Sequence, residues 1–217
     1  MIIYSSAIQG YELTSFELLI RQNIHMQENP LNYWKTLKSA ELLNASPWIR
    51  HSVEQVKLPD GRVIEDYHQI ELMDYAGVVA QTVDGKVIFE RMYKHGVKKV
   101  CLTLPGGGIN PNEDPLAAAR RELLEETGYV AEDWQSLGTF VSDGNYGCGR
   151  ANLFFARSAK QVTSPHSADL EDMEVVLLSL DEMQDCLSQG LFAILGAAAG
   201  VALALNAGLF DPPATRA

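Results

Sequence analysis

Residues 105–129 read PGGGINPNEDPLAAARRELLEETGY, and this stretch decides how the rest of the chain is interpreted. Three glycines and three prolines fall within its first eleven residues, which predicts irregular structure there. The remainder predicts a helix over 116–127, with Asp114 as N-cap, Pro115 in the first helical position and Gly128 as the stop. A glycine-rich loop therefore leads directly into a capped helix.

The predicted helix carries an acidic face. Glu122 and Glu126 are four residues apart and lie one turn above each other, with Glu125 at the edge of the same face. Like charges at this spacing destabilise an isolated helix. The face is either a solvated acidic surface or a site for a divalent cation. Mg²⁺ binds a few carboxylates together with water and phosphate oxygens.

The spacing of the polar residues resembles the Nudix box, the signature of hydrolases that cleave a nucleoside diphosphate linked to another group. The pattern is Gly107-x5-Glu113-x7-Arg121-Glu-Leu-x-Glu-Glu-x-Gly128-Tyr129. Every fixed position is present, and only Tyr129 is unusual, because an aliphatic residue is commoner there. The resemblance implies an α/β fold, the Nudix α/β/α sandwich with a mixed β-sheet, to which this chain adds a small N-terminal β-rich region.

The resemblance also implies roles for the residues of the box. Glu122 and Glu126 would bind Mg²⁺, for which Mn²⁺ could substitute, and the carbonyl of Gly106 would contact the metal. Glu125 would be a further ligand or would orient Arg121. Arg121 would brace the loop and the glutamates through ion pairs, as part of the catalytic set.

A late acidic loop, SADLEDME at 167–174, lies where related enzymes carry the general base. Glu171 matches that position best, and we expect it to act as catalytic base and metal ligand. Asp169 and Glu174 are the alternatives, and a merely solvated loop is the simpler interpretation.

The flanking sequence, over roughly residues 30–205, is similar to the ADP-ribose and ADP-sugar pyrophosphatase branch of the family. This similarity implies Mg²⁺-dependent hydrolysis of ADP-ribose or another ADP-sugar to AMP and a sugar phosphate. It also implies a homodimer in which the N-terminal β region pairs with the second subunit.

The chain departs from that branch near the predicted site. Lys94 stands where arginine is usual, Thr103 where glutamate is usual and Gly106 where alanine is usual. Lys94 and Arg150 are the predicted substrate-binding cations, and lysine cannot form the bidentate fork of arginine. Substrate preference is therefore left open by these positions.

Two other functions stay open at this point. One is a Nudix hydrolase of another nucleotide, such as GDP-mannose, NADH, a dinucleotide or a nucleoside triphosphate. The other is a non-catalytic regulator that binds a nucleotide, which the intact box disfavours.

Amino-acid composition narrows the classes of binding partner and the cellular compartment that we expect. The 217 residues carry a net charge of −11, which argues against a broad nucleic-acid surface. Three scattered cysteines favour a reducing cytoplasm over a disulfide framework. The uncharged run at 191–210 is long enough to span a bilayer, but it lacks flanking anchor residues. We therefore expect a buried closing helix and no membrane partner.

We expect three regions: an extension at 1–28, a helix and β-hairpin region for dimerisation at 29–73, and the Nudix domain at 74–217. The expected strands are 52–58, 63–72, 76–83, 87–93, 100–104, 134–141, 152–157 and 174–180. The expected helices, besides 116–127, are 31–44, 181–189 and 192–206.

Overall fold

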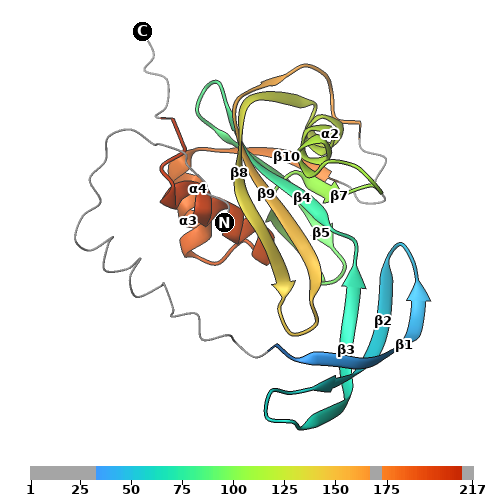
Figure 1. Cartoon of the computed structure of the whole chain (residues 1–217). Coiled ribbons are helices and arrows are strands. Elements are labelled where there is room, and N and C mark those ends of the chain that lie inside the picture. Colours follow the sequence, from blue (N-terminus) through green and yellow to red (C-terminus); the bar gives the residue numbers. More distant parts are fainter. Residues whose placement is uncertain (1–32, 167–172, 212–217) are drawn as a thin grey trace, which may run out of the picture.

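The computed structural model describes residues 33–166 and 173–211, which form two β-sheets and three helices (Figure 1). The smaller sheet is antiparallel, with the order β1 (Lys35–Ala45), β2 (Ile49–Lys57) and β3 (Val63–Leu72). We call it the arm, because it extends from the larger body in Figure 1. The backbone N–H of Ile70 in the arm donates to the carbonyl of Tyr146 in the body at 3.2 Å.

The larger sheet is mixed and has the order β10-β5-β4-β9-β8, with β6 paired to β5 and β7 paired to β4. Only the β4–β9 pairing is parallel among these described strands. The strands are β4 Tyr75–Thr82, β5 Val87–Lys94, β6 Lys99–Thr103, β7 Gly106–Gly108, β8 Tyr129–Asp143, β9 Cys148–Gln161 and β10 Met173–Leu178.

Helices cover both faces of this sheet (Figure 1). Helix α2 (Pro115–Thr127) packs on one face, and α3 (Leu180–Ser188) and α4 (Leu195–Asn206) pack on the other. The result is the expected α/β/α sandwich with an N-terminal β-rich arm.

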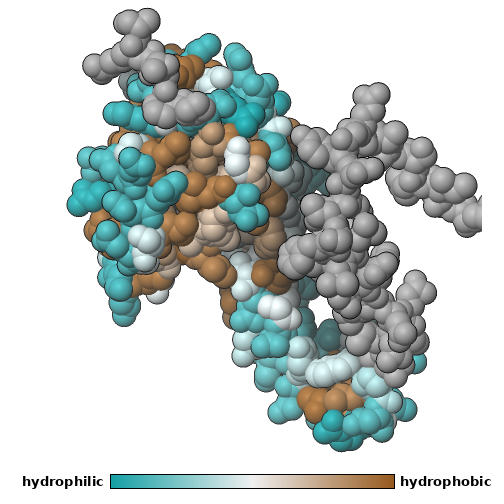
Figure 2. Space-filling view, turned by 90° about the vertical axis from the view of Figure 1, so that its left-hand side faces the viewer, coloured by the Kyte–Doolittle hydropathy of each residue, from teal (hydrophilic) through white to brown (hydrophobic). Residues whose placement is uncertain are grey.

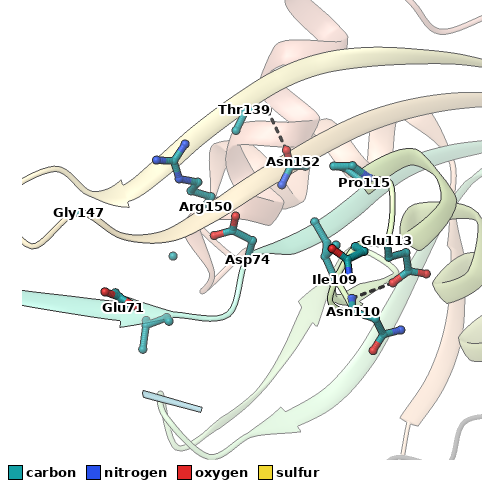
Figure 3. Close-up of a pocket in the computed structure, with 13 residues that line it drawn as sticks. Glu71, Asp74, Ile109, Asn110, Glu113, Pro115, Thr139, Gly147, Arg150 and Asn152 are labelled. Atoms are coloured by element: carbon teal, nitrogen blue, oxygen red, sulfur yellow. Dashed lines mark hydrogen bonds between the residues drawn. The ribbon is translucent and has the colours of Figure 1, made fainter. Parts of the chain in front are cut away.

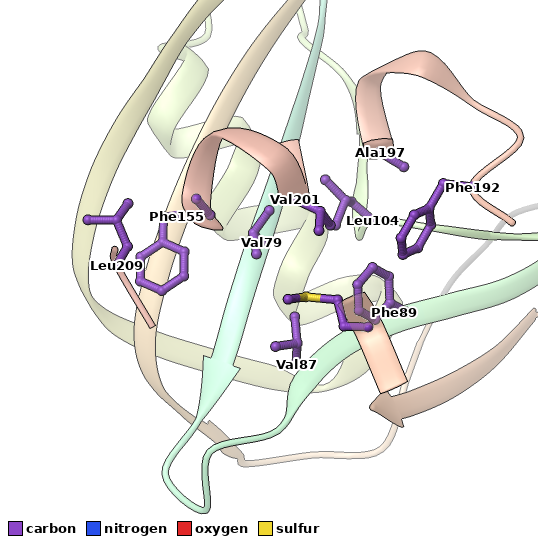
Figure 4. Packing of buried hydrophobic residues seen from close by; sticks show 11 residues of the cluster. Val79, Val87, Phe89, Leu104, Phe155, Phe192, Ala197, Val201 and Leu209 are labelled. Atoms are coloured by element: carbon purple, nitrogen blue, oxygen red, sulfur yellow. The ribbon is translucent and has the colours of Figure 1, made fainter. Parts of the chain in front are cut away.

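Alternating side chains of the strands build a core on each face of the sheet. Val79 and Phe89 belong to the core under α3 and α4 (Figure 4), whereas Val78 and Ile88, one position away, pack beneath α2. Burying a side chain of this size stabilises the fold by about 1.5–3 kcal/mol. These contacts hold α2 against the sheet and so fix where its acidic face lies.

The ends of α2 confirm the expected caps. The carboxylate of Asp114 accepts hydrogen bonds from the backbone N–H groups of Leu116 and Ala117, both at 3.1 Å. Gly128 ends the helix in the left-handed conformation, with φ +75°, where a side chain would be strained.

The helix expected over 31–44 is wrong, because its described part from Lys35 onwards belongs to β1, which pairs with β2. The pairing has register shifts between Thr36 and Lys38 and between Glu41 and Leu43. Each irregularity breaks the two-residue alternation of a strand. The apolar residues therefore fall at spacings that imitate a helix.

The glycine-rich stretch is also more regular than expected. Gly106–Gly108 forms the short strand β7, which pairs antiparallel with Tyr75–Gly77 of β4. A Cβ atom at Gly106 would lie 2.2 Å from the carbonyl oxygen of Ala76. Glycine is needed here so that two backbones can approach each other closely. The conformational freedom of the three glycines therefore serves a strand and not the expected irregular loop.

The uncharged run near the C-terminus forms the expected closing helix. Ala197, Gly200, Val201 and Ala204 of α4 are buried at helical spacing. A Cβ at Gly200 would lie 2.9 Å from a methyl group of Leu104, so small residues allow α4 to approach the sheet closely.

Among the described residues, no helix is long and apolar enough to cross a membrane. Figure 2 shows apolar side chains gathered on the face that carries α3 and α4.

Candidate functional site

Arg121 of α2 connects the loop before the helix to the acidic helix face. Its Nε and Nη2 donate to the two carboxylate oxygens of Glu113 at 2.9 and 3.0 Å. Its Nη1 donates to Glu122 at 2.6 Å and to Glu125 at 3.2 Å, and Nη2 also donates to the carbonyl of Gly108 at 3.1 Å. A single guanidinium therefore holds three carboxylates and β7 in one arrangement.

These contacts shift the pKa values of Glu113 and Arg121. Hydrogen bonds from Arg121, and then from the backbone N–H of Asn110, lower the pKa of Glu113 to about 2. The same carboxylates, Glu113 foremost, raise the pKa of Arg121 above its usual value. Both partners thus stay charged across the ordinary pH range.

Glu122 and Glu126 face β7, and both are buried. The backbone N–H of Gly106 donates to Oε2 of Glu126 at 2.7 Å. A Cβ at Gly107 would lie 2.6 Å from Oε1 of Glu122, so this glycine leaves room for the carboxylate. The repulsion along the acidic face is offset by Arg121 at one carboxylate and by a backbone N–H at the other.

Glu90 of β5 is a further buried carboxylate that the sequence analysis missed. Its side chain is 1% exposed, and its Oε1 has no hydrogen-bond partner within the described part of the chain. Burial raises the pKa of Glu90 to about 10, and the neighbouring carboxylate of Glu126, with which it shares a hydrogen bond, adds to the rise. The signal in the sequence was a glutamate two residues after Ile88, at an inward position of an apolar strand.

Thr103, where the related branch usually has a glutamate, lies directly across from Glu90 in the β5–β6 pairing. Directly paired side chains lie on the same face of a sheet. The chain therefore lacks the carboxylate that the related branch carries on β6, and Glu90 of β5 places one directly opposite that position.

A cavity of about 670 Å³ opens between the arm, the β8–β9 hairpin and the loop before α2 (Figure 3). Arg150 lines it together with the carboxylates of Glu71, Asp74 and Glu113. The other lining residues are Leu72, Ile109, Asn110, Asn112, Pro115, Thr139, Gly147, Gly149 and Asn152. Glu113 thus belongs both to this cavity and to the ion-pair network of Arg121.

The structure does not bring the two predicted substrate-binding cations together in this cavity. Lys94, at the end of β5, is not among its lining residues. Its charge instead acts on Glu90, whose pKa it lowers in part.

Glu171 and Asp169, two candidates for the general base, lie outside the described residues. The third, Glu174, forms an exposed ion pair with Arg91 at 2.9 Å. His166, the last described residue before the gap, donates its backbone N–H to the carbonyl of Glu125 at 2.7 Å. Met173, the first after the gap, pairs with Met92 of β5.

The donor set fits a hard cation. Glu122 and Glu126 with the carbonyl of Gly106 offer only oxygen ligands, and the unpartnered Oε1 of Glu90 adds another. Within 33–166 and 173–211, no three His, Cys, Asp or Glu side chains form a ready metal cage. Mg²⁺ does not require one, because it is usually bound by one or two carboxylates plus water and substrate phosphates.

Comparisons with known proteins agree with this geometry. The family model described as NUDIX domain matches residues 72–194, more than half of the chain. The methanol dehydrogenase activator of Bacillus methanolicus is 26% identical over 152 residues, covering 68% of this chain and 80% of that protein. The ADP-ribose pyrophosphatase of Bacillus subtilis is 26% identical over 134 residues, covering 60% and 70%.

A solved structure shares the fold. The crystal structure of an ADP compounds hydrolase superposes with a TM-score of 0.69 at 21% identity, covering 81% of this chain and 94% of that chain.

Proposed function

From the premise that this chain belongs to the NUDIX domain family and is a pyrophosphohydrolase, we propose that it hydrolyses ADP-ribose or another ADP-sugar to AMP and a sugar phosphate. The observation that carries the proposal is the Arg121 network, which holds Glu122 and Glu125 beside the buried Glu126. The similarity to the Bacillus subtilis ADP-ribose pyrophosphatase supports the choice of substrate.

Glu122, Glu126, Glu125 and the Gly106 carbonyl are the proposed ligands of Mg²⁺ or Mn²⁺. When bound, the cation neutralises phosphate charge as a Lewis acid and lowers the pKa of water. Arg121 keeps the helix glutamates oriented through the contacts described above.

The remaining chemistry is proton transfer and phosphate binding. A water oxygen forms a bond to one phosphorus, and the bond from that phosphorus to the bridging oxygen breaks. Glu171 is the proposed base that takes the water proton and a further metal ligand. Lys94 and Arg150 are the proposed contacts to the anionic substrate.

The cavity supports a substrate that carries a sugar. Its volume lies in the range of small-molecule sites. Carboxylates such as Glu71 and Asp74 repel phosphate but accept hydrogen bonds from hydroxyl groups, and the side-chain amide of Asn110 can both donate and accept. We therefore assign this cavity to the sugar, with Arg150 in its lining as the proposed phosphate contact.

The proposed enzyme is a cytoplasmic homodimer. Exposed apolar residues of the arm, among them Trp34 and Trp48, support pairing with a second copy. Free thiols at all three cysteines support a reducing compartment. Sedimentation of the purified chain tests the dimer directly.

A substrate panel tests the activity. ADP-ribose, GDP-mannose, NADH, a dinucleotide and 8-oxo-dGTP are incubated with the protein and Mg²⁺, Mn²⁺ or EDTA, and products are separated by chromatography. We expect AMP from ADP-ribose with either metal and none in EDTA. Preferential cleavage of another member reassigns the substrate, and binding without any cleavage contradicts catalysis.

A further inference from the structure

We propose that Glu90 binds the divalent cation together with Glu126, as a carboxylate pair formed between β5 and α2. This inference rests on the proposed function, because it places an additional ligand in the same metal site. It concerns a residue of the NUDIX domain that lies outside the box at 107–129.

The geometry of the pair is the first argument. Glu90 is 1% exposed, and its carboxyl is within hydrogen-bonding reach of the Glu126 carboxyl. Glu126 is fixed in turn by the backbone N–H of Gly106 at 2.7 Å. Two carboxyl groups therefore meet between a strand and a helix that packing holds in place.

The unpartnered oxygen is the second argument. Oε1 of Glu90 accepts no hydrogen bond from the described residues, although buried carboxylate oxygens are normally satisfied. An oxygen with free lone pairs beside another carboxylate is a suitable ligand for a hard cation.

The balance of charge is the third argument. The groups that act on Glu90 are the carboxylates of Glu126 and Glu122 and the ammonium of Lys94. Arg121 also contacts Glu122, at 2.6 Å, so three carboxyl groups and two cations meet here. A divalent cation would add positive charge where carboxyl groups outnumber cations.

The competing explanation is a buried carboxylic acid that shares a proton with Glu126 and serves only to join β5 to α2. Glu90→Gln separates the two, because glutamine keeps the shape and its amide can still donate to Glu126. If Glu90 is only structural, Glu90→Gln should leave metal binding unchanged. If Glu90 is a metal ligand, the same change should weaken metal binding.

The experiment uses the full chain and Mn²⁺ alone as the probe. Mn²⁺ binding is measured by calorimetry and electron paramagnetic resonance for the wild type, Glu90→Gln and the control Glu132→Gln, which changes an exposed carboxylate of β8. We expect Glu90→Gln to weaken Mn²⁺ binding about 10–100-fold, in the range found when groups that support a metal site are removed. The control should bind like the wild type.

Melting temperatures report whether the variants fold. In EDTA, Glu90→Gln should melt near the wild-type temperature, because glutamine keeps the shape of the side chain and can still donate to Glu126. In excess Mn²⁺ the melting temperature of Glu90→Gln should rise by less than the melting temperatures of the wild type and the control. If Glu90→Gln does not fold, Mn²⁺ binding is measured for Glu90→Asp instead, because aspartate keeps the carboxylate on a shorter side chain.

A swap of two residues provides a second test. Because Thr103 lies opposite Glu90 on the same face, the double variant Glu90→Thr, Thr103→Glu moves the carboxylate from β5 to β6. We expect it to recover Mn²⁺ binding relative to Glu90→Thr alone. Recovery would not follow if Glu90 acted only as a structural acid.

The results distinguish this inference from the proposed function. Unchanged Mn²⁺ affinity in Glu90→Gln, with metal-dependent cleavage by the wild type, overturns the Glu90 ligand and leaves the activity. Weakened affinity, with no cleavage of any substrate by the wild type, supports the ligand and overturns the activity.

Discussion

Arg121 and Glu113 are joined by two hydrogen bonds, from Nε to Oε1 at 2.9 Å and from Nη2 to Oε2 at 3.0 Å. The pair links the loop that borders the cavity to the helix that carries Glu122 and Glu126. Planar, bidentate contacts of this kind add geometric specificity as well as strength.

Replacing Arg121 by lysine should reduce kcat/KM for ADP-ribose about 100-fold. An ammonium cannot hold Glu113 bidentately while it contacts Glu122, and small displacements of catalytic groups have effects of this size. Arg120→Lys is the matched control, because the neighbouring guanidinium lies over the ring of Trp134 and has no role in the network. Equal activity of the two variants would contradict the bracing role.

Gly107→Ala should lower activity more than stability. The new Cβ would lie 2.6 Å from the Glu122 carboxylate, which is the flexible end of a side chain and can move aside. Moving it displaces a proposed metal ligand. Steady-state kinetics and thermal melting are compared with Gly96→Ala, whose Cβ would meet nothing within 4 Å. A fully active Gly107→Ala would show that the position of Glu122 is unimportant.

Glu126→Gln should reduce kcat about 10²–10³-fold, the range seen when one electrostatic contact to the transition state is removed. Excess Mn²⁺ should restore part of the activity if the loss reflects weaker metal binding. Glu132→Gln controls for the change in net charge. No loss of activity would exclude Glu126 as a ligand.

Acid should remove the contribution of Glu113 to stability. Its pKa is about 2 in the folded chain and near 4.5 otherwise, so the unfolded state binds the proton more readily. The stabilisation is complete above pH 4.5 and is lost as the pH falls from there towards 2. Urea unfolding of the wild type and Glu113→Gln should therefore differ most at pH 6, and the difference should shrink steadily between pH 4.5 and pH 2. A constant difference across this window would contradict the depressed pKa.

Glu171→Gln tests the proposed base. It should lower kcat by about 10²–10⁴-fold, the range for acid–base catalysis, with a smaller effect on KM. Asp169→Asn and Glu174→Gln are assayed beside it, and Glu174 already pairs with Arg91. A large loss of kcat in one of these two variants, with normal turnover in Glu171→Gln, would assign the general base to that residue instead.

The box itself was predictable from the sequence, because its signals are local. Asp114, Pro115 and Gly128 mark the ends of α2, and the spacing of Glu122 and Glu126 puts them on one face. The closing helix α4 was predictable for the same reason. β1 was not, since bulges concealed its alternation and its partner strand decided its conformation.

The sequence by itself determined the kind of chemistry, through a capped helix that carries an arginine and three glutamates at set intervals. Only the tertiary structure decided which other groups join them. Glu90 is 36 residues from Glu126 in the chain, and strand pairing and packing beneath α2 bring their carboxyl groups together. Helical spacing is a property of neighbouring residues, whereas the burial of Glu90 and its unpartnered oxygen depend on contacts between distant segments.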